Sequence, residues 1–266
     1  MKVQQVFSLI DAVAPFETQL EYDNSGLLIG SPSAEVTGIL FALDVTDRVI
    51  DEALSLGADL IVTHHPLLFN AVHRITDEDY EGRLIMKMIR SGLSLISAHT
   101  NLDQAPSGIN DALAEIVGLK DVTGEGFVRV GLSPVPLKAS EWAAHLSAVL
   151  HTTVRLMGDP DKTIARIGLC SGSGGDEWKK AKELGAEGFV SGEIKHHFAL
   201  EMADDGITAF ECGHFATEEP GIFALADALQ SAFNQVEYKV GVYKSEAGAY
   251  RFPSRCDKGG FADGTV

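Results

Sequence analysis

The sequence LIVTHHP at residues 60–66 places four apolar or β-branched residues directly before two adjacent histidines and a proline. Such a short run after the turn LGAD at residues 56–59 is typical of a strand buried on both faces of a parallel sheet. Side chains just past the C-terminal end of that strand point to where α/β folds bind ligands. The stretch therefore predicts an α/β fold with His64 and His65 in its ligand site, as metal ligands or as hydrogen-bonded structural histidines.

Alternating strands and helices are expected on both sides of this stretch. Thr46 suits the N-cap of a helix that Gly57 ends. The next strand along the chain delivers AHTNLD at residues 98–103, with His99 and Asp103, to the same edge of the sheet. Hydrophobic patterning predicts strands at 27–30, 38–43 and 93–97, and helices at 3–13, 47–56, 81–91 and 109–117.

The second half of the chain repeats this plan. LGAD at residues 56–59 returns as LGAE at residues 184–187, and GLS at 92–94 corresponds to GIT at 206–208. Glycine, proline and acidic residues in the same order indicate a tandem duplication. We expect two similar α/β units, residues 1–128 and 129–266, that join within 124–135. The C-terminal segment is then available to pack back on the first unit.

The duplication predicts a metal site in the cleft between the two units. Positions 64 and 65 correspond to Gly192 and Glu193, so the second copy lacks the histidine pair. The loop after the next strand instead carries ECGHFATE at residues 211–218. The cleft can thus collect three imidazoles and two carboxylates: His64, His65, Asp103, His214 and Glu218. This donor set, without a thiolate, suits divalent Zn, Mn, Fe, Co or Ni. A shared carboxylate allows two ions about 3.5–4 Å apart, as in hydrolytic two-metal sites.

Charge and composition narrow the function classes. The formal net charge of −17 disfavours nucleic-acid partners and attracts cations to an acidic cleft. Three distant cysteines fit reduced thiols in a cytosol. No segment approaches the roughly 20 apolar residues of a membrane span. We therefore expect a cytoplasmic protein without membrane attachment.

Several stretches, taken in order, resemble the motifs of the Nif-three-like dinuclear-metal family, also named the GTP cyclohydrolase I type 2 homologues. They are DNSGL at 23–27, THHP at 63–66, SAHTNLD at 97–103, SGEIKHH at 191–197 and GHFATE at 213–218. The resemblance covers essentially the whole chain. It implies two α/β domains of similar topology around a two-metal cleft, with the same five ligands matched residue by residue. It also implies a ring-shaped homohexamer whose sites face an inner cavity, in the compact form that lacks an inserted domain.

Each candidate has an alternative role. Asp103 would equally cap the helix that starts near Ile109, and His214 with Glu218 would equally form a helix start with an acidic first turn. His99 is a candidate proton donor or substrate contact, or else a packing histidine. Glu193 and His196 are three apart, which is compatible with one helical face and with another metal site. They are also candidates for acid/base or substrate-binding groups in the same cleft. A polar helix start explains them as well.

Two function classes fit this pattern. The first is a metal-dependent hydrolase of a nucleotide or related heterocycle, and the family name suggests GTP opened at its imidazole ring. The acidic exterior argues mildly against a triphosphate, and a phosphoester or another cyclic amide suits the same ligands. The second is a non-catalytic metal-binding ring that stores, delivers or senses metal, or that scaffolds a partner.

Overall fold

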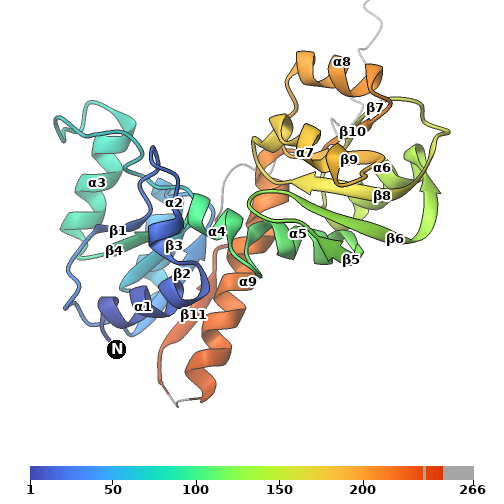
Figure 1. The fold of residues 1–266 in the computed structure, drawn as a ribbon. Coiled ribbons are helices and arrows are strands. Elements are labelled where there is room, and N and C mark those ends of the chain that lie inside the picture. The colour runs from blue at the N-terminus through green and yellow to red at the C-terminus, as the bar shows by residue number, and fades with distance from the viewer. Residues whose placement is uncertain (236–237, 248–266) are drawn as a thin grey trace, which may run out of the picture.

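The computed structural model describes residues 1–235 and 238–247, which form two β-sheets with helices packed on them. Figure 1 shows the two sheets as separate lobes, with a long helix, α9 (His214–Gln235), running between them. No helix in the described part of the chain is long and apolar enough to cross a membrane.

The first sheet contains the strand that carries the histidine pair. Its order is β1 (Gly26–Ile29), β4 (Ser94–Ser97), β3 (Leu60–Thr63), β2 (Gly38–Ala42) and β11 (Gly241–Lys244). All neighbours are parallel except β1, which runs antiparallel to β4. Every residue of β2, β3 and β4 is buried, as the unbroken apolar runs predict. Its helices are α1 (Val3–Val13), α2 (Asp47–Leu56) and α3 (Tyr80–Arg90).

The second sheet repeats the order and directions of four strands of the first, and its two further strands, β6 (Arg129–Lys138) and β5 (Lys120–Thr123), are antiparallel. Its order is β7 (Arg155–Met157), β10 (Thr208–Glu211), β9 (Gly188–Ser191), β8 (Thr163–Cys170), β6 and β5. The end strand β7 is antiparallel to β10, and β10, β9 and β8 are parallel, as in the first sheet. The helices are α6 (Ala139–Val149), α7 (Trp178–Glu183) and α8 (His196–Asp204). The predicted fold class, two similar α/β units, is confirmed.

The chain crosses between the sheets more than once. β5 precedes the predicted join but belongs to the second sheet, whereas β11 follows it and pairs with β2 in the first. The segment expected to hold the join contains most of β6. The limits of the two units stay a prediction.

Local sequence signals fixed several element ends. The Thr46 side chain accepts a hydrogen bond from the Val49 amide at 3.2 Å, and Gly57 ends α2 in the left-handed conformation. Both α2 and α5 (Ile109–Val117) have the predicted bounds. Residues 100–104, for which no helix was predicted, form the short helix α4 (Thr100–Gln104). Two 3₁₀ turns, η1 (Phe16–Thr18) and η2 (Gly174–Asp176), were also not predicted.

A close contact between α5 and α9 joins the two halves. Gly221 of α9 lies against Ile109 of α5, and a Cβ atom at Gly221 would come within 2.6 Å of the Ile109 Cα atom. Farther along α9, Leu225, Leu229 and Phe233 are buried in the core of the first unit. The N-terminal turn of α9 is therefore held at the ends of the strands of both sheets.

Candidate metal centre

His64 is fully buried at the end of β3 and presents a lone pair to two carboxylates. Its Nδ1 atom lies 2.8 Å from the Ala98 carbonyl oxygen, which only accepts hydrogen bonds, so Nδ1 carries the proton. The Nε2 atom then faces Asp103 Oδ1 at 3.5 Å and Glu218 Oε1 at 3.8 Å. Burial lowers the pKa of His64 to about 3, which keeps the ring neutral. His64 Nε2 and Asp103 Oδ1 have no hydrogen-bond partner.

His65 contacts a carboxylate at each ring nitrogen. Its Nδ1 atom donates to Asp44 Oδ1 at 2.7 Å, and its Nε2 atom lies 3.0 Å from Glu218 Oε2. Burial opposes protonation of this ring. The hydrogen bonds to Asp44 and Glu218 outweigh the burial and raise the pKa of His65 to about 10. The metal-free ring therefore holds a proton that a bound cation would replace.

His214 supplies the corresponding imidazole from the second half of the chain. Its Nδ1 atom donates to Glu193 Oε1 at 2.8 Å, and its Nε2 atom lies 2.9 Å from Glu218 Oε2. His214 and Glu218 share one face of the first turns of α9, as their spacing of four predicts. Burial opposes protonation of His214, but contacts with Glu218 and Glu193 raise its pKa above the ordinary value.

The carboxylate of Glu218 lies between two groups of donors. Its Oε1 atom faces His64, whereas Oε2 faces His65 and His214. Glu218 belongs to two triads whose ligand atoms lie within 4.8 Å of one another: His64, Asp103 and Glu218; His65, His214 and Glu218. His64, His65 and His99 form a third such group, without Glu218. Burial opposes ionisation of Glu218, yet the hydrogen bonds from His214 and His65 hold its pKa below the usual range.

The donor set fits divalent cations. Buried lone pairs converge from imidazole nitrogens and carboxylate oxygens, and His64 Nε2 and Asp103 Oδ1 among them have no hydrogen-bond partner. Burial and the Glu218 charge raise the pKa of Asp103 well above its ordinary value, because the two acidic groups share one small space. A cation between them would relieve this repulsion. Imidazole and carboxylate donors of this kind suit first-row divalent ions.

Two glycines let the second unit approach the centre. A Cβ atom at Gly172, which has a φ of +54°, would lie 1.9 Å from Glu218 Oε1. One at Gly192 would lie 2.8 Å from both the His214 Cα atom and Thr217 Oγ1. Gly192 occupies the repeat position of His64. The second copy therefore has no histidine there because the first turn of α9 fills that space.

Carboxylates orient three of the imidazoles through Nδ1. Asp44 holds His65, Glu193 holds His214, and Asp23 holds His99 at 2.8 Å. Such partners fix the tautomer and the ring direction of metal-binding histidines. Sequence reasoning missed Asp23 and Asp44 in this role. The available signals were the place of Asp23 in the DNSGL motif and that of Asp44 after the buried strand β2.

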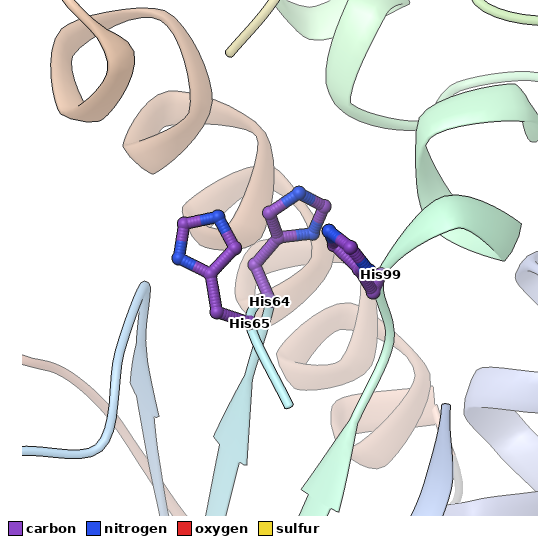
Figure 2. A group of neighbouring side chains, drawn as sticks. All are labelled: His64, His65 and His99. Atoms are coloured by element: carbon purple, nitrogen blue, oxygen red, sulfur yellow. The ribbon is translucent and has the colours of Figure 1, made fainter. Parts of the chain in front are cut away.

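His99 is brought into the cluster, at the start of α4. Its ring centroid lies 5.1 Å from that of His64 and 5.6 Å from that of His65. Figure 2 shows the three rings gathered beyond the ends of the strands. The Nδ1 atom of His99 is held by Asp23, so Nε2 is the atom that remains to act.

The remaining predicted residues take different places. Asp103 is buried within α4 and does not cap α5, whose N-cap is Gly108. Glu193 precedes α8, accepts a hydrogen bond from Ser173 Oγ at 2.8 Å and pairs with His214. His196 is exposed at the first position of α8 and takes no part in these contacts. The structure therefore does not pair Glu193 with His196, because the helix begins after Glu193.

Comparisons with known proteins agree with this geometry. The model of the family described as Duf34/NIF3 (NGG1p interacting factor 3) matches residues 1–249. A Clostridium perfringens protein named GTP cyclohydrolase 1 type 2 homolog is 33% identical over 256 residues, which cover 90% of this chain and 96% of that protein. A Campylobacter jejuni protein of the same name is 34% identical over 239 residues, covering 89% and 95%.

Solved structures show the same fold. Staphylococcus aureus hypothetical protein SA1388 superposes with a TM-score of 0.89 at 30% identity and covers 92% of this chain and 96% of its own. Reduced HcgD from Methanocaldococcus jannaschii gives 0.78 at 26% identity, with coverage of 92% and 98%. The family match spans all of the described residues, and the resemblance noted from the motifs is confirmed. The chain therefore belongs to the Duf34/NIF3 family.

Proposed function

We propose that this protein is a metal-dependent hydrolase of a nucleotide or related heterocycle, with two divalent ions in each subunit. The observation that carries the proposal is the position of Glu218, whose two oxygens face separate groups of donors. One ion would be held by His64, Asp103 and Glu218, and the other by His65, His214 and Glu218. Zn, Fe, Mn, Co and Ni all suit these donors.

When bound, divalent ions supply Lewis acidity and lower the pKa of coordinated water toward neutrality. The protein orients the donors. Asp44 and Glu193 keep the Nδ1 protons of His65 and His214, so that each Nε2 lone pair points inward. His99, fixed by Asp23, can hold or release a proton at Nε2 beside the cluster. The hydrogen bond from Ser173 lowers the pKa of Glu193, which keeps it an ionised acceptor.

Partial exposure on one side favours catalysis over metal storage. The His64 side chain is fully buried, but those of His65 and His214 are 25% and 34% exposed. A hydrolytic site needs an open position at which substrate and water can enter. A storage site gains most from enclosing its metal on all sides. The names of the Clostridium and Campylobacter relatives support a heterocyclic substrate.

Metal-reconstituted protein tests this proposal. It should turn over at least one member of a panel of nucleotides, nucleosides and cyclic amides that includes GTP, with products identified by mass spectrometry. His65→Ala should abolish turnover, whereas His73→Ala, at an exposed histidine outside the cluster, should retain it. Equal inactivity of the wild type and His65→Ala on every compound would favour the non-catalytic metal-binding ring.

We also propose that the subunits assemble as a ring-shaped homohexamer. An apolar groove on the first unit, lined in part by Val72, Ile75 and Ile89, supports an assembly surface there. Light scattering after size-exclusion chromatography should give six times the subunit mass. Ile89→Asp should reduce that mass, and an unchanged hexamer in this variant would assign the groove another role.

A further inference from the structure

Two exposed aromatic side chains stand beside the metal centre. Tyr22 is 67% exposed and Phe69 is 42% exposed, and their ring centroids are 6.4 Å apart. Phe69 in turn contacts His99 edge to face, with centroids at 6.1 Å and planes at 83°. We call Tyr22 and Phe69 the aromatic wall. It extends the row of rings from the histidine cluster toward solvent.

The aromatic wall is held in place although its rings are exposed. The Asn24 side chain donates to the Leu68 carbonyl oxygen at 2.5 Å, which ties the segment of Tyr22 to the segment of Phe69. Asp23, next to Tyr22, accepts hydrogen bonds from His99 and from the Thr100 hydroxyl. These bonds anchor the wall to the same residues that orient the cluster. Rings that are fixed but uncovered offer a preorganised surface for stacking a planar ligand.

The aromatic wall lies near acidic groups of both units. The Tyr22 hydroxyl lies in the field of Asp103 from the metal centre and of Asp176 from the second unit. Burial, followed by Asp23 and these two carboxylates, raises the pKa of Tyr22. A flat molecule on the wall would therefore lie beside the histidine cluster, which Phe69 contacts through His99.

The negative charge of the metal centre favours uncharged flat molecules over phosphorylated ones. Five carboxylates belong to the centre and its orienting contacts: Asp23, Asp44, Asp103, Glu193 and Glu218. Within the described residues, every ion pair of the centre has a histidine, and none a lysine or arginine, as its basic partner. Two divalent ions would bring four positive charges against these five negative ones. Each phosphate adds roughly one to two further negative charges to these acidic surroundings.

We propose that the aromatic wall stacks an uncharged planar heterocycle, a purine base or nucleoside, against the metal centre. This inference rests on the proposed function and narrows its substrate class away from nucleoside triphosphates. Stacking supplies affinity without charge, since every base has a π-face. The acidic cleft then disfavours each added phosphate.

Calorimetric titration of the full-length, zinc-loaded protein with guanosine, GMP and GTP tests the inference. Affinity should fall in that order. Phe69→Leu and Tyr22→Leu should each weaken guanosine binding ~10-fold, within the range for one base–aromatic stack. Phe69→Trp should preserve binding, and its new indole fluorescence should be quenched by guanosine. Tyr238→Leu, at an exposed tyrosine between α9 and β11, is the matched control and should bind as the wild type does.

Three outcomes would overturn the inference: unchanged guanosine affinity in both leucine variants, tighter binding of GTP than of guanosine, or no saturable binding of any base or nucleoside. Zinc content, measured by plasma mass spectrometry on each sample, separates this inference from the proposed function. Full zinc with no nucleoside binding counts against the aromatic wall alone. Nucleoside binding without retained zinc, or without turnover, counts against the proposed hydrolase alone.

Discussion

The Nε2 atom of His65 lies 3.3 Å from the Nε2 atom of His214, although the two residues are 149 positions apart. Both atoms also lie within 3.0 Å of the same oxygen of Glu218. His65 comes from the first unit and His214 from the first turn of α9. The centre thus exists only when the two halves of the duplicated chain meet.

Metal affinity should rise with pH. The pKa of His65 is raised to about 10 in the metal-free protein, so binding at neutral pH must release its proton. Between pH 6 and 8, affinity should improve by up to about tenfold per pH unit for this one proton. Titration calorimetry in buffers of different ionisation enthalpy would show the proton release. Affinity that is constant over this range would contradict the raised pKa.

The raised pKa of His65 should make the metal-free protein less stable as pH rises, although metal affinity increases over the same range. Because the folded-state pKa of His65 is raised, its stabilising contribution is complete below the unfolded value of about 6.5 and is lost as pH rises through about 10. Urea denaturation of metal-free protein between pH 6 and 10 should therefore show falling stability. His65→Ala should flatten that part of the profile.

Glu218→Gln should reduce the content of both ions, because Glu218 is the residue common to the two triads. His64→Ala should remove mainly one ion, because His64 belongs to only one of the two triads that share Glu218. Plasma mass spectrometry after dialysis would give the metal per chain. Glu201→Gln changes a carboxylate on α8 that pairs with Lys179 of α7, and this variant should keep the wild-type content. Equal metal loss in the His64 and Glu218 variants would argue against a shared carboxylate.

Gly172→Ala should remove metal binding with little change in fold. The added Cβ atom would lie 1.9 Å from Glu218 Oε1, so this carboxylate has to move. Gly206→Ala is a close control, because Gly206 also has a positive φ but a Cβ atom there meets nothing within 4 Å. Both variants should lose about 1 kcal/mol from the left-handed backbone. Only Gly172→Ala should lose metal, and equal retention by both would show that the close approach is unimportant.

Asp44→Asn should weaken metal binding about 10- to 100-fold, since outer partners of ligating histidines have effects of that size. Asp44 orients His65 through Nδ1 without itself entering either triad. Competition with a chelator would measure the change. Asp51→Asn, at an exposed residue paired with Lys87, is the control. If Asp44→Asn binds metal as tightly as Asp51→Asn does, Asp44 does not orient His65 for metal binding.

The features that could be predicted from the sequence are those marked by local patterns of apolar residues, caps and glycines. Buried strand β3, helix α2 with its cap at Thr46, and the repeat itself were readable because apolar runs and glycine stops are local. The meeting of His64 with Glu218 could be proposed because both follow strand ends. Their approach also requires glycine at positions 172 and 192, because a side chain there would collide with α9. The sequence alone does not show that α9 lies against these two positions.

Other features depend on packing that no local pattern records. Asp103 lies in α4, a helix too short for periodicity to detect. Asp44 and Asp23 lie outside helices and strands, and only the fold places them against His65 and His99. The spacing of Glu193 and His196 suggested one helical face, but α8 begins at His196 and leaves Glu193 to His214.

Anomalous diffraction from crystals of the metal-reconstituted protein, recorded at the absorption edge of the bound metal, tests the central claim most directly. The account predicts two anomalous peaks about 3.5–4 Å apart, the spacing of hydrolytic two-metal sites. Glu218 should lie between them, with His64 and Asp103 on one side and His65 and His214 on the other. A single peak, or peaks away from Glu218, would contradict it.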